Sequence, residues 1–162
     1  MKRKISVIGL LLAIMLVNIA PVSAAETGKQ KYIVADIEQM CPEELALRKK
    51  LGMSADTPQL VSSTISTGTA LTINSSGDAG CGGTVSGGDN IRTIQIFLYL
   101  QKNSDKSNVM TWMDTKDSMV FGISRHHQLT QRGTYIVKMS AYVYTKDGNY
   151  ENLVRYSHTD TY

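Results

Sequence analysis

Two stretches of the chain, residues 91–101 and 134–145, alternate apolar and polar side chains with a period of two. Because successive side chains of a strand point to opposite faces, this period predicts two long β-strands, each with one face in the core. The predicted core faces carry Ile94, Ile96, Leu98 and Leu100 in the first strand, and Tyr135, Val137, Met139, Ala141 and Val143 in the second.

The opposite faces of these two strands carry four aromatic residues: Phe97, Tyr99, Tyr142 and Tyr144. If the strands are neighbours, these rings form one aromatic face that could stack on sugar rings or anchor a protein partner. Two structural alternatives stay open. The rings could form cross-strand pairs that only stabilise the sheet, or they could lie beneath a helix.

From residue 60 onward, β-branched residues dominate and turn-forming clusters recur about every ten residues, which is typical of a sandwich or barrel. Further strands are expected near 61–66, 70–74, 80–86, 109–114, 119–124 and 150–158. Hairpin turns are expected at residues 74–78 and 146–149, where Gly and Asn or Asp suit positive φ. We therefore expect an all-β protein, an antiparallel immunoglobulin-like sandwich of seven to eight strands.

One short helix is expected before the strands, over about residues 42–51. Pro42 suits a first helical turn, acidic residues follow it, basic residues come near the end, and Gly52 stops the helix. Leu45, Leu47 and Leu51 give the helix a modest apolar side, which we expect to pack on the domain.

The segment from Leu129 to Ala141 resembles the entry to the sixth strand of immunoglobulin-like and fibronectin type III domains, where a Leu, a Gly and a Tyr precede an alternating strand. The resemblance implies a structural role for Tyr135, as a buried corner tyrosine with its hydroxyl bonded to nearby backbone. Val137 stands where antibody domains carry their second cysteine, and Trp112 comes one strand later than the usual core tryptophan, so both depart from the antibody pattern.

Residues 60–162 also resemble small secreted proteins of clostridia and related Gram-positive bacteria that have no assigned function. The shared features are an export signal, a Ser/Thr/Gly-rich first half, the strand Leu98–Gln101, Trp112, the Gly133–Tyr135 corner and the ending Tyr156–Tyr162. This resemblance implies a fold and supplies no catalytic residues.

The N-terminus has three basic residues, an apolar run over residues 5–17 and small residues at 22–24, which together predict a secretory signal peptide over residues 1–24. Residues 25–59 then form a leader with the short helix, and 60–162 the sandwich domain. Cleavage after Ala24 would remove three of the 17 basic residues and leave 14 basic against 14 acidic ones. A neutral mature chain disfavours nucleic acid as a partner, and no membrane span is expected after cleavage.

Cys41 and Cys81 are the two cysteines of the chain. In an exported protein an even pair favours one disulfide, which we predict here, with two unpaired thiols as the open alternative.

No motif of high catalytic specificity is present. His126 and His127 could bind a metal with His158, Asp114 or Asp117, but neighbours on a strand point apart, so a polar turn is favoured. Asp114 and Asp117 are expected to be solvated turn residues rather than an acid–base pair. The glycines at 80–83 and 87–88 lack the following helix of a phosphate loop and are interpreted as bulges or turns.

The sequence therefore predicts a secreted, monomeric, non-catalytic binding or interaction module, extracellular or loosely associated with the bacterial cell wall. It would bind a cell-wall glycan or a surface protein through Phe97, Tyr99, Tyr142 and Tyr144, without cofactor or metal. A small secreted toxin or bacteriocin-like effector is the alternative that fits the same features.

Overall fold

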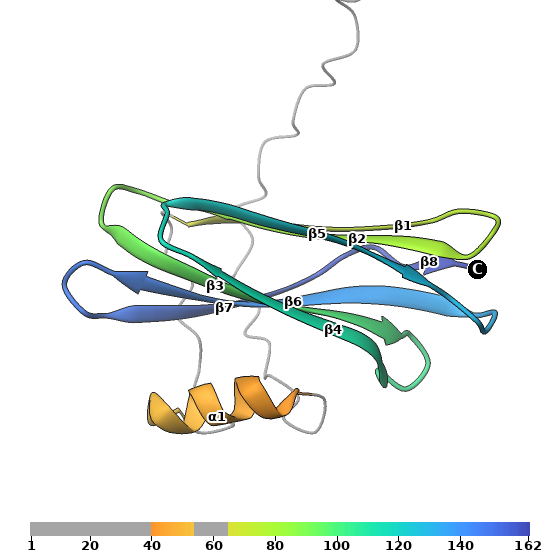
Figure 1. The fold of residues 1–162 in the computed structure, drawn as a ribbon, viewed down its shortest axis with the longest axis horizontal. Helices are drawn as coiled ribbons and strands as arrows, with labels where there is room; N and C mark the ends of the chain where they lie inside the picture. The colour runs from red at the N-terminus through yellow and green to blue at the C-terminus, as the bar shows by residue number, and fades with distance from the viewer. Residues whose placement is uncertain (1–39, 54–64) are drawn as a thin grey trace, which may run out of the picture.

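A computed structural model describes residues 40–53 and 65–162, and Figure 1 shows them as two stacked antiparallel sheets with one helix outside. One sheet has the order β1-β2-β5 and the other β4-β3-β6-β7, with the short β8 paired to β6. The strands are β1 (Ser66–Ile73), β2 (Asp78–Ser86), β3 (Ile91–Lys102), β4 (Asn108–Lys116), β5 (Val120–Gln128), β6 (Thr134–Thr145), β7 (Tyr150–Tyr156) and β8 (Asp160–Thr161). The all-β, immunoglobulin-like sandwich predicted from the sequence is confirmed.

The core lies between the two sheets. All of the aliphatic side chains predicted to face inward from β3 and β6 are fully buried there, and Leu71, Cys81 and Val85 meet them from the other sheet. Gly83 lets β2 pack closely on the other sheet, because a Cβ atom there would lie 2.8 Å from Met139 Sδ. The interpretation of the 80–83 glycines as bulges or turns was wrong, since these residues lie in the regular interior of β2.

Some element boundaries differ from the predictions. β6 has the predicted bounds, whereas the strands expected near 61–66 and 70–74 correspond, in their described part, to the single strand β1. The predicted last strand ends at Tyr156, and β8 follows it. The predicted signal peptide, most of the leader and residues 61–64 lie outside the described residues.

The corner role implied for Tyr135 is confirmed. Its ring is 2% exposed at the start of β6, and its hydroxyl donates a hydrogen bond of 2.6 Å to the Gln131 carbonyl. Both hairpin turns are also present, with Gly77 at φ +88° and Gly148 at φ +89°. The turns join β1 to β2 and β6 to β7, and the non-consecutive pairing of β3 with β6 places the two aromatic-bearing strands side by side.

The helix α1 (Pro42–Lys50) lies on the outer face of the β4-β3-β6-β7 sheet, away from the other sheet (Figure 1). Pro42 opens the helix, acidic and basic residues occupy its first and last turns as predicted, and Gly52 follows it at φ +66°. Along the described ranges, no helix combines the length and the apolar character needed to span a membrane.

The apolar side predicted for α1 is partly wrong. Leu45 is 39% exposed, whereas the fully covered side chains of the helix are Glu44 and Arg48. Glu44, Leu47, Arg48 and Leu51 lie three to four residues apart and therefore share one helix face. The helix thus presents a mixed polar and apolar stripe to the sheet.

Candidate binding site

The structure places the four aromatic residues predicted to bind a ligand together on one sheet face, but it does not leave that face open. Phe97, Tyr99 and Tyr142 are 0% exposed and pack against Cys41, Leu47, Leu51 and Met53 of the α1 segment. The expectation of an exposed aromatic binding face is corrected, because α1 covers three of its four rings. Tyr144, at the edge of this cluster, keeps part of its surface exposed.

Glu44 is the centre of the contact between α1 and the sheet. Its carboxylate accepts hydrogen bonds from three hydroxyl groups, those of Tyr99, Ser140 and Tyr142, the last at 2.9 Å. The carboxylate is fully buried, so these bonds replace the water that it loses. We call Tyr99, Ser140 and Tyr142 the hydroxyl cradle. The cradle binds the first turn of α1 to the sheet.

Arg48 makes the second polar contact of the helix, one turn later. Its Nη1 donates to Asn152 Oδ1 on β7 at 3.2 Å, and Asn152 Nδ2 donates in turn to Ser140 Oγ at 3.1 Å. The two anchors therefore share Ser140 and Asn152 as one buried network. This network was not predicted from the sequence, although Glu44 and Arg48 are spaced to share one helix face with Leu47 and Leu51.

The electrostatics of this contact keep the tyrosines protonated. Burial raises the pKa of Tyr99 and of Tyr142 well above the ordinary value of 10.0, and the nearby Glu44 carboxylate raises both further. A neutral phenol can donate to Glu44, whereas a phenolate would repel it. The cradle is therefore a built-in carboxylate receptor that α1 itself occupies.

Beside the C-terminal half of α1, a groove of about 440 Å³ remains open. One wall is formed by Leu47, Lys50 and Leu51 of the α1 segment, and the other by the outer face of the sheet and its β6–β7 turn. The sheet residues are Arg92, Thr93, Gln95, Thr115, Tyr144, Gly148 and Tyr150. We call this the α1 groove; it contains Tyr144, the accessible member of the four aromatic residues predicted to bind a ligand.

Two tyrosines form the aromatic part of the α1 groove. Tyr144 and Tyr150 are cross-strand partners on β6 and β7, with ring centroids 6.3 Å apart and an angle of 45° between the planes. The Tyr150 hydroxyl donates to the Leu51 carbonyl at 3.1 Å and so ties the helix wall to the sheet wall. Burial raises the pKa of Tyr144, and Tyr150 adds to this effect.

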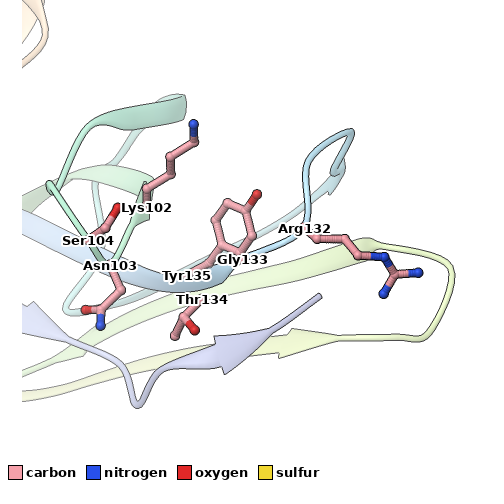
Figure 2. Close-up of a pocket in the computed structure, with 7 residues that line it drawn as sticks. All are labelled: Lys102, Asn103, Ser104, Arg132, Gly133, Thr134 and Tyr135. Carbon is pink, nitrogen blue, oxygen red and sulfur yellow. The ribbon is translucent and has the colours of Figure 1, made fainter.

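A second hollow, of about 410 Å³, lies at the Tyr135 corner (Figure 2). Its cations do not converge: Figure 2 shows Lys102 and Arg132 extending in different directions. Lys102 Nζ donates to Gln131 Oε1 at 2.7 Å, and the Arg132 guanidinium lies 4.9 Å from the centre of the Tyr162 ring. These contacts stabilise the corner, so this hollow is the weaker candidate.

The predicted disulfide between Cys41 and Cys81 is absent, and both cysteines are free. Cys81 points into the core from β2, whereas Cys41 precedes α1 on the far side of the other sheet. The intervening sheet therefore separates the two thiols. Burial raises the pKa of Cys81 to about 12, and burial also raises that of Cys41.

The two adjacent histidines lie in the regular strand β5, so the expectation of a polar turn was wrong, and they make separate contacts. His126 Nδ1 is 3.0 Å from Asp78 Oδ2, and the His127 ring packs edge-on against Trp112, with centroids 6.5 Å apart. Asp114 lies in β4 rather than in the expected turn and is paired with Arg125 at 3.2 Å, whereas Asp117 follows β4 and accepts a bond from Thr93. Across residues 40–53 and 65–162, no three His, Cys, Asp or Glu side chains are grouped to hold a metal.

Comparisons with known proteins give little further information. No family model and no curated protein matches the chain. Among solved structures, it is similar to the crystal structure of wild-type OgpA from Akkermansia muciniphila, with a TM-score of 0.36 and 10% sequence identity. That match covers 76% of this chain and 38% of OgpA. The resemblance to small secreted clostridial proteins stays a prediction.

Proposed function

We propose that the protein is an exported, non-catalytic binding module of the bacterial cell envelope and that it binds a cell-wall ligand in the α1 groove. Export rests on the predicted signal peptide over residues 1–24. The observation that carries the proposal is the combination of two tyrosine rings with amide and hydroxyl side chains in one open groove. Aromatic rings with a few polar groups are typical of ligand sites that recognise sugars or peptides.

The surroundings of the groove favour binding over catalysis. General acid–base chemistry needs an accessible carboxyl or imidazole within hydrogen-bond reach of a substrate. The residues that line the α1 groove include neither, and the buried carboxylate of Glu44 is fully engaged with the hydroxyl cradle. The groove therefore has recognition groups without an acid–base pair.

Co-sedimentation tests this function. The chain without its predicted signal peptide, residues 25–162, is mixed with washed insoluble Gram-positive cell walls and, separately, with cellulose. We expect pelleting with the walls alone, and loss of most of it on Tyr144→Ala, which removes an accessible groove ring. Val120→Ala is the matched control, because Val120 is 56% exposed on the opposite sheet and should leave pelleting unchanged.

Two results would overturn the proposal. Protein that stays in the supernatant with walls would argue for a diffusible effector, with growth inhibition of related strains as the next assay. Pelleting that Tyr144→Ala leaves intact would place the ligand elsewhere on the surface.

A further inference from the structure

We propose that the ligand of the α1 groove is an anionic glycan, a chain of sugars that carry carboxylate or phosphate groups. This inference rests on the proposed function and deepens it. It is based on two features of the same groove: a cation on each of its two walls, and aromatic rings on the wall that the sheet forms.

The charge of the groove comes from Lys50 and Arg92. Lys50 is in the last turn of α1 and Arg92 near the start of β3, so the cations stand on opposite walls, and both are exposed. No Asp or Glu is among the residues that line the groove. An anion held between the walls would therefore contact a cation on each side, and arginine adds the geometry for bidentate bonds.

Carboxylates near the groove are already engaged. Asp117 accepts a hydrogen bond of 2.6 Å from the Thr93 hydroxyl, and the Asp147 carboxylate is turned toward Thr145 and Asn149. Glu151 is the cross-strand partner of Val143, whose side chain faces the core. Glu151 and Tyr150 therefore lie on opposite faces of β7. Lys50 and Arg92 thus line the groove, whereas the nearby Asp117 and Asp147 carboxylates are hydrogen-bonded to neighbouring side chains and do not line it.

The rings favour a sugar as the carrier of the charge. Tyr144 and Tyr150 line the groove with their ring planes tilted by 45° to each other, and cross-strand pairing and the bond from Tyr150 to Leu51 hold them in place. Such fixed amphipathic rings give large contact area at low entropic cost. Gln95 adds an amide group to the groove, and its Nε2 donates a hydrogen bond to Met113 Sδ at 3.3 Å. Because a thioether sulfur is a weak acceptor, a sugar hydroxyl can replace Met113 as the acceptor with little loss of free energy.

Isothermal titration calorimetry with three probes tests the inference. The probes are hexagalacturonate, the same hexasaccharide with every carboxyl group methyl-esterified, and hexaglutamate. Hexaglutamate carries the negative charges but has no sugar rings. The protein is the chain without its predicted signal peptide. We expect hexagalacturonate to bind at least about tenfold more tightly than either comparison probe, because each of the others lacks one of the two recognised features.

Variants assign the selectivity to the groove. Arg92→Gln and Lys50→Gln should each weaken hexagalacturonate binding by about five- to tenfold and leave binding of the esterified probe unchanged. Lys49→Gln is the control, since it removes a neighbouring exposed helix cation that does not line the groove.

The outcomes separate this inference from the proposed function. Equal binding of acid and ester, or no measurable binding of hexagalacturonate, overturns the anionic glycan while wall pelleting can still succeed. Stronger binding of hexaglutamate would instead assign an acidic peptide. Selectivity retained in Arg92→Gln and Lys50→Gln overturns the assignment to this groove.

Discussion

The Glu44 carboxylate on α1 accepts a hydrogen bond of 2.9 Å from the hydroxyl of Tyr142 on β6, although the two residues are 98 positions apart in the chain. Tyr99 and Ser140 complete the hydroxyl cradle around the same carboxylate. This buried acid therefore holds the first turn of α1 on the sheet, and Arg48 and the Tyr150–Leu51 bond hold the rest of the helix and one wall of the α1 groove.

Glu44→Gln should loosen α1 without unfolding the sandwich. The amide has one acceptor oxygen and no charge, so it cannot accept all the hydrogen bonds that the carboxylate accepts. We expect the docking of α1 on the sheet to weaken by about 2 kcal/mol. Hydrogen exchange should show a loss of protection of roughly tenfold or more confined to α1 and the adjacent Tyr99 strand segment. Glu43→Gln is the matched control, because Glu43 is exposed in the same helical turn. Unchanged protection in Glu44→Gln would contradict the anchoring role.

Stability should fall at alkaline pH through the cradle tyrosines. The pKa of Tyr99 and of Tyr142 is raised in the folded state above the ordinary 10.0, so the folded chain holds these protons more tightly than the unfolded chain. Their contribution is full below pH 10 and is lost progressively as the pH rises above it.

Thermal melts from about pH 8 to about pH 11 measure this loss. The double variant Tyr99→Phe/Tyr142→Phe should be less stable at neutral pH but show a smaller decline. Cys81, whose pKa is also raised, is present in both proteins and cancels in the comparison. Parallel declines of the two proteins would show that the cradle tyrosines do not carry the effect.

Tyr135→Phe should destabilise the sandwich by about 1–2 kcal/mol, because it removes the bond to Gln131 and leaves a carbonyl short of a donor at the corner. Urea unfolding followed by Trp112 fluorescence gives the free energy. Tyr162→Phe serves as control: it keeps the ring beneath Arg132, and its hydroxyl has no hydrogen bond within the described residues. Equal effects of the two substitutions would argue against a special corner bond.

The two cysteines should remain thiols with unequal reactivity. Cys41 is partly exposed and Cys81 is 1% exposed, so alkylation of the native protein should modify Cys41 first and Cys81 only after denaturation. Mass spectrometry of the oxidatively purified, non-reduced protein counts the modified thiols. A mass two hydrogens lower, with no alkylation after denaturation, would reinstate the disulfide.

Local patterns were sufficient for most of the fold. The two-residue period predicted β3 and β6 and their buried faces, and the charge order around Pro42 and Gly52 predicted α1. The Gly133–Tyr135 corner implied the role of Tyr135. These features depend on neighbours in sequence, because strand pleat, helix dipole and turn geometry act over a few residues.

The candidate site depended on contacts that no local pattern contains. The sequence by itself determined that Phe97 and Tyr99 share one face of their strand and that Tyr142 and Tyr144 share one face of theirs; the pairing of these two strands came from the structure. Only the tertiary structure decided that Glu44 docks among their hydroxyls, covers three of the rings and leaves Tyr144 beside an open groove. It also decided that Cys41 and Cys81 lie on opposite sides of a sheet. The physical reason is that the alternation of apolar and polar residues specifies the two faces of a strand. Which of these faces another element covers depends on burial and hydrogen bonding between residues far apart in the chain.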